Sequence, residues 1–119
     1  MNVYKLFTTH YGSSDFSKGR FEDSKKIASI YFFLHEDPIE RRFSDWHPAP
    51  RRQYVITLRG ILEFTVTNGQ SFILRPGDVL IADDVLSTGH KWRMISEESW
   101  IRAYIVLTEN DTDGFIANP

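Results

Sequence analysis

The sequence predicts an all-β fold, and three of its features lead to this prediction. Apolar and polar residues alternate with a period of two along much of the chain, which is typical of strands with one buried face. Residues 27–34 are mostly β-branched or aromatic, and these residue types favour strands. Turn sequences separate the alternating segments at Arg59-Gly60, Asn68-Gly69 and Pro76-Gly77. Short strands joined by tight turns indicate a jelly roll or a barrel.

The strands are expected, in order, at 27–34, 53–58, 61–67, 70–74, 79–82, 91–95 and 100–107. The first ends before Pro38, because proline cannot continue a hydrogen-bonded ladder. Arg59-Gly60 is expected to join the second and third strands as a hairpin. Asn68-Gly69 is a pair that tolerates positive φ, so a tight type I′ turn is predicted there.

The ends of the chain have weaker patterns than its middle. Residues 1–23 show little periodicity and contain a polar Gly-Ser-Ser-Asp cluster at 12–15, so an N-terminal arm or edge strand is expected. Residues 109–119 read as a polar C-terminal tail, in which Phe115 and Ile116 are the apolar positions. The length of 119 residues fits a single domain over 1–119.

Composition narrows the possible partners. The formal net charge of −2 provides no general attraction to nucleic acid or to an anionic membrane, so a small molecule is the expected partner. The absence of cysteine excludes disulfides, thiolate nucleophiles and zinc–thiolate sites. No segment approaches the ~20 apolar residues that span a bilayer, and a cytoplasmic location is expected.

Two motifs between residues 46 and 90 carry the main indication of function. The first consists of His47, Ala49, Gln53 and, after six further residues, Gly60. The second is a Gly-Asp turn followed by a strand and a histidine, and it falls on Pro76, Gly77, Asp78 and His90. This pattern resembles the cupin superfamily, and the chain is similar to its small single-domain members. Ala49 and Gln53 stand where that family usually has a histidine and a glutamate.

The resemblance implies a double-stranded β-helix, the cupin jelly roll, which commonly holds a divalent metal. Here it implies either no cofactor or one weakly held ion of iron, manganese, nickel or zinc on His47, Gln53 and His90. The amide of Gln53 lacks the carboxylate charge that helps to hold such an ion. The resemblance also implies a homodimer, in which a second sheet or subunit covers the face of Tyr54, Ile56 and Leu58.

Strand alternation assigns residues to the expected cavity, because side chains two positions apart share a face. His90 therefore groups with Trp92 and Met94, and Gln53 groups with Val55 and Thr57. A cavity with apolar walls and a few polar groups is typical of small-molecule sites. We expect Gln53, Trp92 and Met94 to contact a substrate.

The candidate catalytic residues are His47, His90 and Asp84. Either histidine could move a proton, and a carboxylate six residues before His90 could orient its ring. Arg51 is the candidate for recognising a carboxylate or phosphate through paired hydrogen bonds. Without the resemblance, His47 reads as a loop histidine, Asp84 as a turn residue and Arg51 as a surface charge.

Three classes of function follow from these residues. The first is metal-independent acid/base isomerisation, cyclisation or elimination of a small and anionic organic molecule. The second is a metal-dependent oxygenase or lyase that uses the two histidines as ligands. The third is a non-catalytic small-ligand binder, since a fold by itself does not establish a function.

Overall fold

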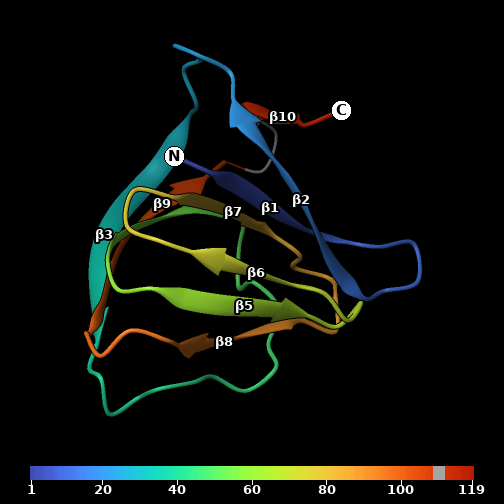
Figure 1. The fold of residues 1–119 in the computed structure, drawn as a ribbon. Helices are drawn as coiled ribbons and strands as arrows, with labels where there is room; N and C mark the ends of the chain where they lie inside the picture. Colours follow the sequence, from blue (N-terminus) through green and yellow to red (C-terminus); the bar gives the residue numbers. More distant parts are fainter. Residues whose placement is uncertain (109–111) are drawn as a thin grey trace.

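The computed structural model describes residues 1–108 and 112–119, and within them the chain is all-β (Figure 1). Its strands are β1 (Val3–Thr8), β2 (Ser14–Phe21), β3 (Ser29–Asp37), β4 (Gln53–Arg59), β5 (Leu62–Val66), β6 (Ser71–Leu74), β7 (Val79–Asp83), β8 (His90–Met94), β9 (Trp100–Leu107) and β10 (Phe115–Ala117). The predicted all-β class is confirmed. In the described part of the chain, no helix is long and apolar enough to cross a membrane.

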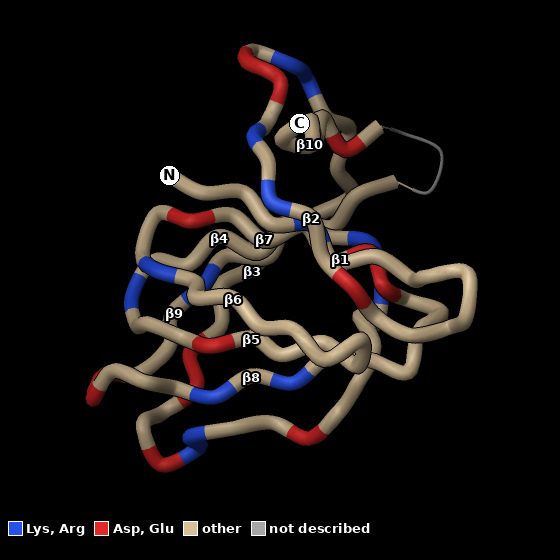
Figure 2. Tube along the Cα trace, turned by 45° about the vertical axis from the view of Figure 1, so that its right-hand side comes forward, with Lys and Arg blue, Asp and Glu red and all other residues tan. Residues whose placement is uncertain are grey.

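The strands form two sheets, which face each other in Figure 1. The larger sheet has the order β10-β2-β1-β7-β4-β9-β3, and the smaller has the order β6-β5-β8. Strands β1 and β7 pair in parallel, whereas the other pairs are antiparallel. Lys and Arg are interspersed with Asp and Glu along the trace in Figure 2, so no face in that view carries one sign of charge.

The main hydrophobic core lies between the sheets, because each sheet turns one set of alternating side chains toward the other. The larger sheet contributes Leu6, Val55, Leu80 and Trp100, among others, and the smaller sheet contributes Leu62, Phe64, Leu74 and Trp92. On β4, Gln53, Val55 and Thr57 are all buried, as the alternation predicts. On β8, His90, Trp92 and Met94 are buried while the two residues between them are exposed.

The predicted hairpin around Arg59-Gly60 is wrong, since β4 and β5 belong to different sheets. The chain crosses between sheets at Gly60, whose φ of 99° favours glycine. The type I′ turn predicted at Asn68-Gly69 is also wrong. Only Gly69 of that pair has positive φ, and the amide of Val66 donates to the carbonyl of Gln70 across a three-residue loop.

The chain ends are more ordered than the sequence indicated. In place of an arm or edge strand over residues 1–23, the structure has the hairpin β1–β2, and β1 lies inside the larger sheet between β2 and β7. The predicted polar tail over 109–119 contains strand β10, which pairs with β2, while 109–111 lie outside the described residues.

The face of the larger sheet opposite the main core is also partly apolar. Tyr54 and Ile56 pack against a second apolar cluster of Val3, Val79 and Ile81, which Phe115 also joins. These residues come from strands of the same sheet, and Tyr54 and Ile56 remain partly exposed, so the expectation that a second sheet or subunit covers this face stays a prediction. Leu58, further along β4, remains 52% exposed.

Candidate functional site

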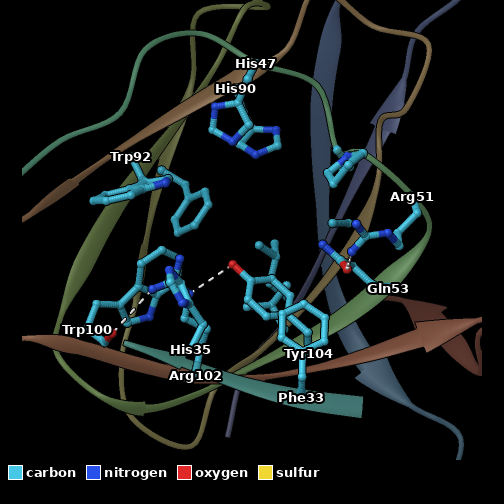
Figure 3. Close-up of a pocket in the computed structure, with 16 residues that line it drawn as sticks. Phe33, His35, His47, Arg51, Gln53, His90, Trp92, Trp100, Arg102 and Tyr104 are labelled. Atoms are coloured by element: carbon cyan, nitrogen blue, oxygen red, sulfur yellow. Dashed lines mark hydrogen bonds between the residues drawn. The ribbon is translucent and has the colours of Figure 1, made fainter. Parts of the chain in front are cut away.

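A cavity of about 370 Å³ lies between the two sheets (Figure 3). Its walls are mostly apolar or aromatic, with a few polar groups at its ends, as is usual for small-molecule sites. The lining residues are Phe33, His35, His47, Ala49, Pro50, Arg51, Gln53, Val55, Phe64, Leu80, Ala82, His90, Trp92, Trp100, Arg102 and Tyr104.

His47 and His90 meet at one end of this cavity. The amide of each donates a 2.9 Å hydrogen bond to the carbonyl of the other, which forms an isolated antiparallel bridge. The two ring centroids are 4.6 Å apart. Gly89 permits this approach, because a β-carbon there would lie 2.5 Å from the backbone carbon of His47. The sequence prediction that these two distant histidines come together agrees with this geometry.

Asp84 holds the ring of His90 from behind. Its carboxylate is shielded completely from solvent, and Oδ2 lies 2.7 Å from Nδ1 of His90. The hydroxyl of Ser14 also donates to Oδ2, and the amide of Ala49 donates to Oδ1. Burial raises the pKa of Asp84, but the hydrogen bonds from His90, Ser14 and Ala49 and the charge that His90 carries when protonated outweigh burial, so the pKa lies below its ordinary value.

These contacts assign the same tautomer to both neutral imidazoles. The ionised Asp84 only accepts hydrogen bonds, so Nδ1 of His90 carries a proton and donates it. Nδ1 of His47 lies 2.9 Å from the carbonyl of Asp45, which also only accepts. The assignment rests on these partners. It follows that Nε2 of each ring carries a lone pair, at the end of the cavity where both rings lie in Figure 3.

The opposite end of the cavity contains a buried ion pair. Nη2 of Arg102 lies 2.8 Å from Oδ2 of Asp37, and both residues are 4% exposed. Nε of Arg102 donates to the hydroxyl of Tyr104, and the guanidinium carbon lies 3.7 Å from the centroid of Trp100. The positive charge of Arg102 is therefore balanced within the protein.

Arg51 and Gln53 line the cavity beside the histidines. Nη1 of Arg51 donates a long 3.4 Å hydrogen bond to Oε1 of Gln53. Among residues 1–108 and 112–119, no carboxylate forms an ion pair with Arg51. Arg51 thus presents a guanidinium to the cavity, and this group can bind an anionic group of a ligand.

The predicted site residues divide into two groups. His47, Arg51, Gln53, His90 and Trp92 line the cavity together. Asp84 lies behind His90 and does not line it, so its role is to position the ring. Met94, expected to contact a substrate, is instead buried in the main core. It lies two residues beyond Trp92, further along β8 than the cavity reaches.

Sequence reasoning missed Ser14, His35, Arg102 and Tyr104. One signal could have identified Arg102, because it alternates with Trp100 and Tyr104 on one face of a predicted strand. A charged residue at an inward strand position is rare unless it is paired. Ser14 gives no comparable signal, since it lies in the weakly periodic N-terminal segment and its partner Asp84 is 70 positions away.

The donor set does not fit a tightly held metal. Where the structure describes the chain, no group of three or more His, Asp or Glu side chains is arranged to bind an ion. The two Nε2 atoms are suitable ligands, but zinc sites use at least three protein ligands. Gln53 already accepts a hydrogen bond from Arg51.

Comparison with known proteins adds no identification. No family model matches the chain, and no curated protein matches it. The geometry defines an all-β protein with an internal cavity. A pair of histidines lies at one end of this cavity, and aromatic side chains form much of its wall.

Proposed function

We propose that this chain is a cupin-type double-stranded β-helix that binds a small organic anion in its cavity and transfers protons on it without a metal. The proposal covers isomerisation, cyclisation and elimination, which all begin with the movement of a proton. Two facing sheets and a histidine at each of two motif positions support the cupin assignment. The size of the cavity suits a ligand of a few carbon atoms up to a small ring.

The contact between Asp84 and His90 carries this proposal. A buried carboxylate on Nδ1 fixes the tautomer in which Nε2 is a base, and it stabilises the imidazolium that forms when Nε2 takes a proton. His47 lies beside it with the same tautomer. One ring can therefore remove a proton from the ligand while the other, once protonated, returns one at a second atom. A positioned acid or base of this kind contributes ~10²–10⁴-fold to a rate.

The position and charge of Arg51 support the proposal that the ligand is an anion. Arg102 has its charge balanced by Asp37, whereas the polar partner of Arg51 in the part of the chain that the structure describes is the amide oxygen of Gln53. A guanidinium pairs with a carboxylate through two parallel hydrogen bonds. This pairing would hold one end of the ligand while its reacting carbon lies toward the histidines.

Hydrogen exchange from solvent tests the proposal without a known substrate. Small carboxylic acids with an acidic carbon-bound hydrogen, such as 2-oxo acids and unsaturated ring acids, are incubated with the protein in deuterium oxide and followed by proton NMR. We expect exchange with at least one such acid, and a loss of about 100-fold or more in His90→Gln. His10→Gln is the matched control, because His10 is exposed and lies outside the cavity.

Other outcomes distinguish the remaining classes of function. Binding of an acid without exchange in the wild-type protein would contradict the catalytic proposal and indicate a non-catalytic binder. Exchange that a chelator abolishes and one divalent ion restores would instead establish the metal-dependent class. Equal exchange in His90→Gln and wild type would exclude His90 as the base.

A further inference from the structure

Strand β3 exposes an uninterrupted apolar segment at the edge of the larger sheet. Ile30, Phe32 and Leu34 are 62%, 71% and 63% exposed on one face. Tyr31 and Phe33, on the other face, are less exposed. No charged residue and no proline occurs between Ser29 and Leu34. A long apolar edge with unpaired backbone groups is a site at which another strand can add.

The other sheet edges in the described chain lack these properties. Strands β10 and β6 have three and four residues, and short edges offer little to a partner. Strand β8 is covered along its outer side, because the segment that contains Ser44 and His47 hydrogen-bonds to it. Strand β3 has nine residues and pairs only with β9 in the described structure.

We propose that a second copy of this chain pairs antiparallel with β3 and joins the two larger sheets into one continuous sheet. The charges at the two ends of β3 support a second copy over a different partner. Lys25 and Lys26 precede the apolar segment, and Glu36 follows it, all of them exposed. Antiparallel pairing of identical strands about a two-fold axis brings the basic end of each beside the acidic end of the other.

The position of the axis follows from the apolar segment. Opposite residues in an antiparallel pair point to the same face of the sheet, so the axis must pass beside a residue and not between two. If it passes beside Tyr31, Glu36 of one copy lies opposite Lys26 of the other. Phe32, the most exposed side chain of the apolar segment, then lies opposite Ile30 of the other copy on the same face, so it is covered in both copies. Opposite charges across paired strands favour this register, whereas a parallel arrangement would put like charges together.

This interface is adjacent to the cavity, although it does not depend on the proposed function. Phe33 and His35 line the cavity from β3, and Phe33 stacks on Tyr104 with ring centroids 4.8 Å apart. A second copy at the edge of β3 would therefore hold one cavity wall in place. The dimer and the proton-transfer proposal can fail separately, because one is measured by mass and the other by exchange.

Sedimentation equilibrium of the wild-type chain and two matched variants tests the interface. We expect the wild type to be a dimer at micromolar concentration. Phe32→Lys should weaken the dimer by more than about 100-fold, because a two-fold interface carries the change twice. Phe43→Lys should remain dimeric, since Phe43 is 70% exposed but lies away from β3. A monomeric wild type, a dimeric Phe32→Lys or a monomeric Phe43→Lys would overturn the proposal.

Charge reversal tests the antiparallel direction. Lys26→Glu and Glu36→Lys should each weaken the dimer, because each places like charges at both ends of the interface. The double variant exchanges the two signs and should recover most of the wild-type affinity. Failure of the double variant to recover any affinity would overturn the antiparallel arrangement. Both side chains are exposed, so these variants leave the fold of each copy intact.

Discussion

The carboxylate of Asp84 lies 2.7 Å from Nδ1 of His90 and has no exposed surface. Its two oxygens have different donors, since the amide of Ala49 occupies Oδ1 while His90 and the hydroxyls of Ser14 and Ser87 share Oδ2. A backbone amide cannot change its role, whereas a neutral imidazole can carry its proton on either nitrogen. The tautomer of His90 is therefore under the control of residue 84.

Asp84→Asn should invert the tautomer of His90. The fixed amide of Ala49 requires an oxygen at the Oδ1 position, so the new NH₂ group faces Nδ1 of His90. That nitrogen must then accept, and the proton moves to Nε2 in the cavity. Imidazole ¹⁵N chemical shifts would report the change, and carbon-hydrogen exchange should fall with it by about 100-fold or more.

Asp45→Asn is the control for this prediction. Asp45 is an exposed carboxylate whose backbone carbonyl, rather than its side chain, contacts His47. It should leave both the tautomer of His90 and the exchange rate unchanged. A protonated Nδ1 on neutral His90 in Asp84→Asn would contradict the assignment of donors around residue 84.

Stability should decline in acid because Asp84 and Asp113 have lowered pKa values. Burial raises the pKa of Asp113. The hydrogen bonds from Lys5 and from the amide of Phe115, together with the charges of Lys5 and Arg52, outweigh burial and lower the pKa below its ordinary value. A folded-state pKa below the unfolded one means that the unfolded chain binds protons first. The stabilisation is thus complete above the ordinary value of 3.8 and is lost as pH falls through the folded-state values.

Urea denaturation from neutral pH down to about pH 2 measures this dependence. Asp113→Asn should lower the free energy of unfolding at neutral pH and make its decline in acid shallower. Asp23→Asn, at an exposed position, should leave the profile parallel to that of the wild type. An unchanged acid slope in Asp113→Asn would show that Asp113 does not contribute.

Local pattern was sufficient to predict which side chains point inward. Alternation placed Gln53, Val55 and Thr57 on the buried face, and the motif positions located His47 and His90. The same pattern could not show which strands pair. A glycine between two alternating segments reads alike whether they form a hairpin or, as at Gly60, cross from one sheet to the other.

The partners of buried charged residues, when they are distant in sequence, could not be predicted from the sequence either. Arg102 could be recognised as an inward charge, but nothing local indicates that its partner is Asp37 at the end of β3. Antiparallel pairing of β3 with β9 brings the two together, since Asp37 pairs with Trp100 and His35 with Arg102. The choice of partner is thus a property of sheet topology, which single-strand patterns do not determine.

Breaking the pair of Arg102 and Asp37 should destabilise the fold strongly. Arg102→Met and Asp37→Asn should each lower the free energy of unfolding by about 3 kcal/mol, because each removes the closest charged partner of a buried group. The double variant should lose clearly less than the sum of the two losses. Urea denaturation of the four proteins measures this coupling.

Arg93→Met provides the comparison for an exposed pair. Arg93 lies 2.7 Å from Glu63, a separation close to that of the buried pair, but its side chain is 59% exposed. Its loss should cost less than about 1 kcal/mol. If Arg93→Met and Arg102→Met cost the same, burial does not determine the strength of these pairs.

Gly89→Ala should separate the two histidines of the site. Gly89 has a φ of 106°, and an added β-carbon would lie 2.5 to 2.8 Å from three backbone atoms of His47. Gly69→Ala is the matched control, because Gly69 has a φ of 99° and nothing within 4 Å of the added carbon. The free energy of unfolding of the control should therefore fall only by the ~1–2 kcal/mol of left-handed backbone strain.

The free energy of unfolding of Gly89→Ala, measured by urea denaturation, should fall by more. Nuclear Overhauser contacts between the rings of His47 and His90 should weaken in Gly89→Ala alone. Equal losses in the two variants, with the ring contacts retained, would show that the close approach at Gly89 does not hold the histidine pair together.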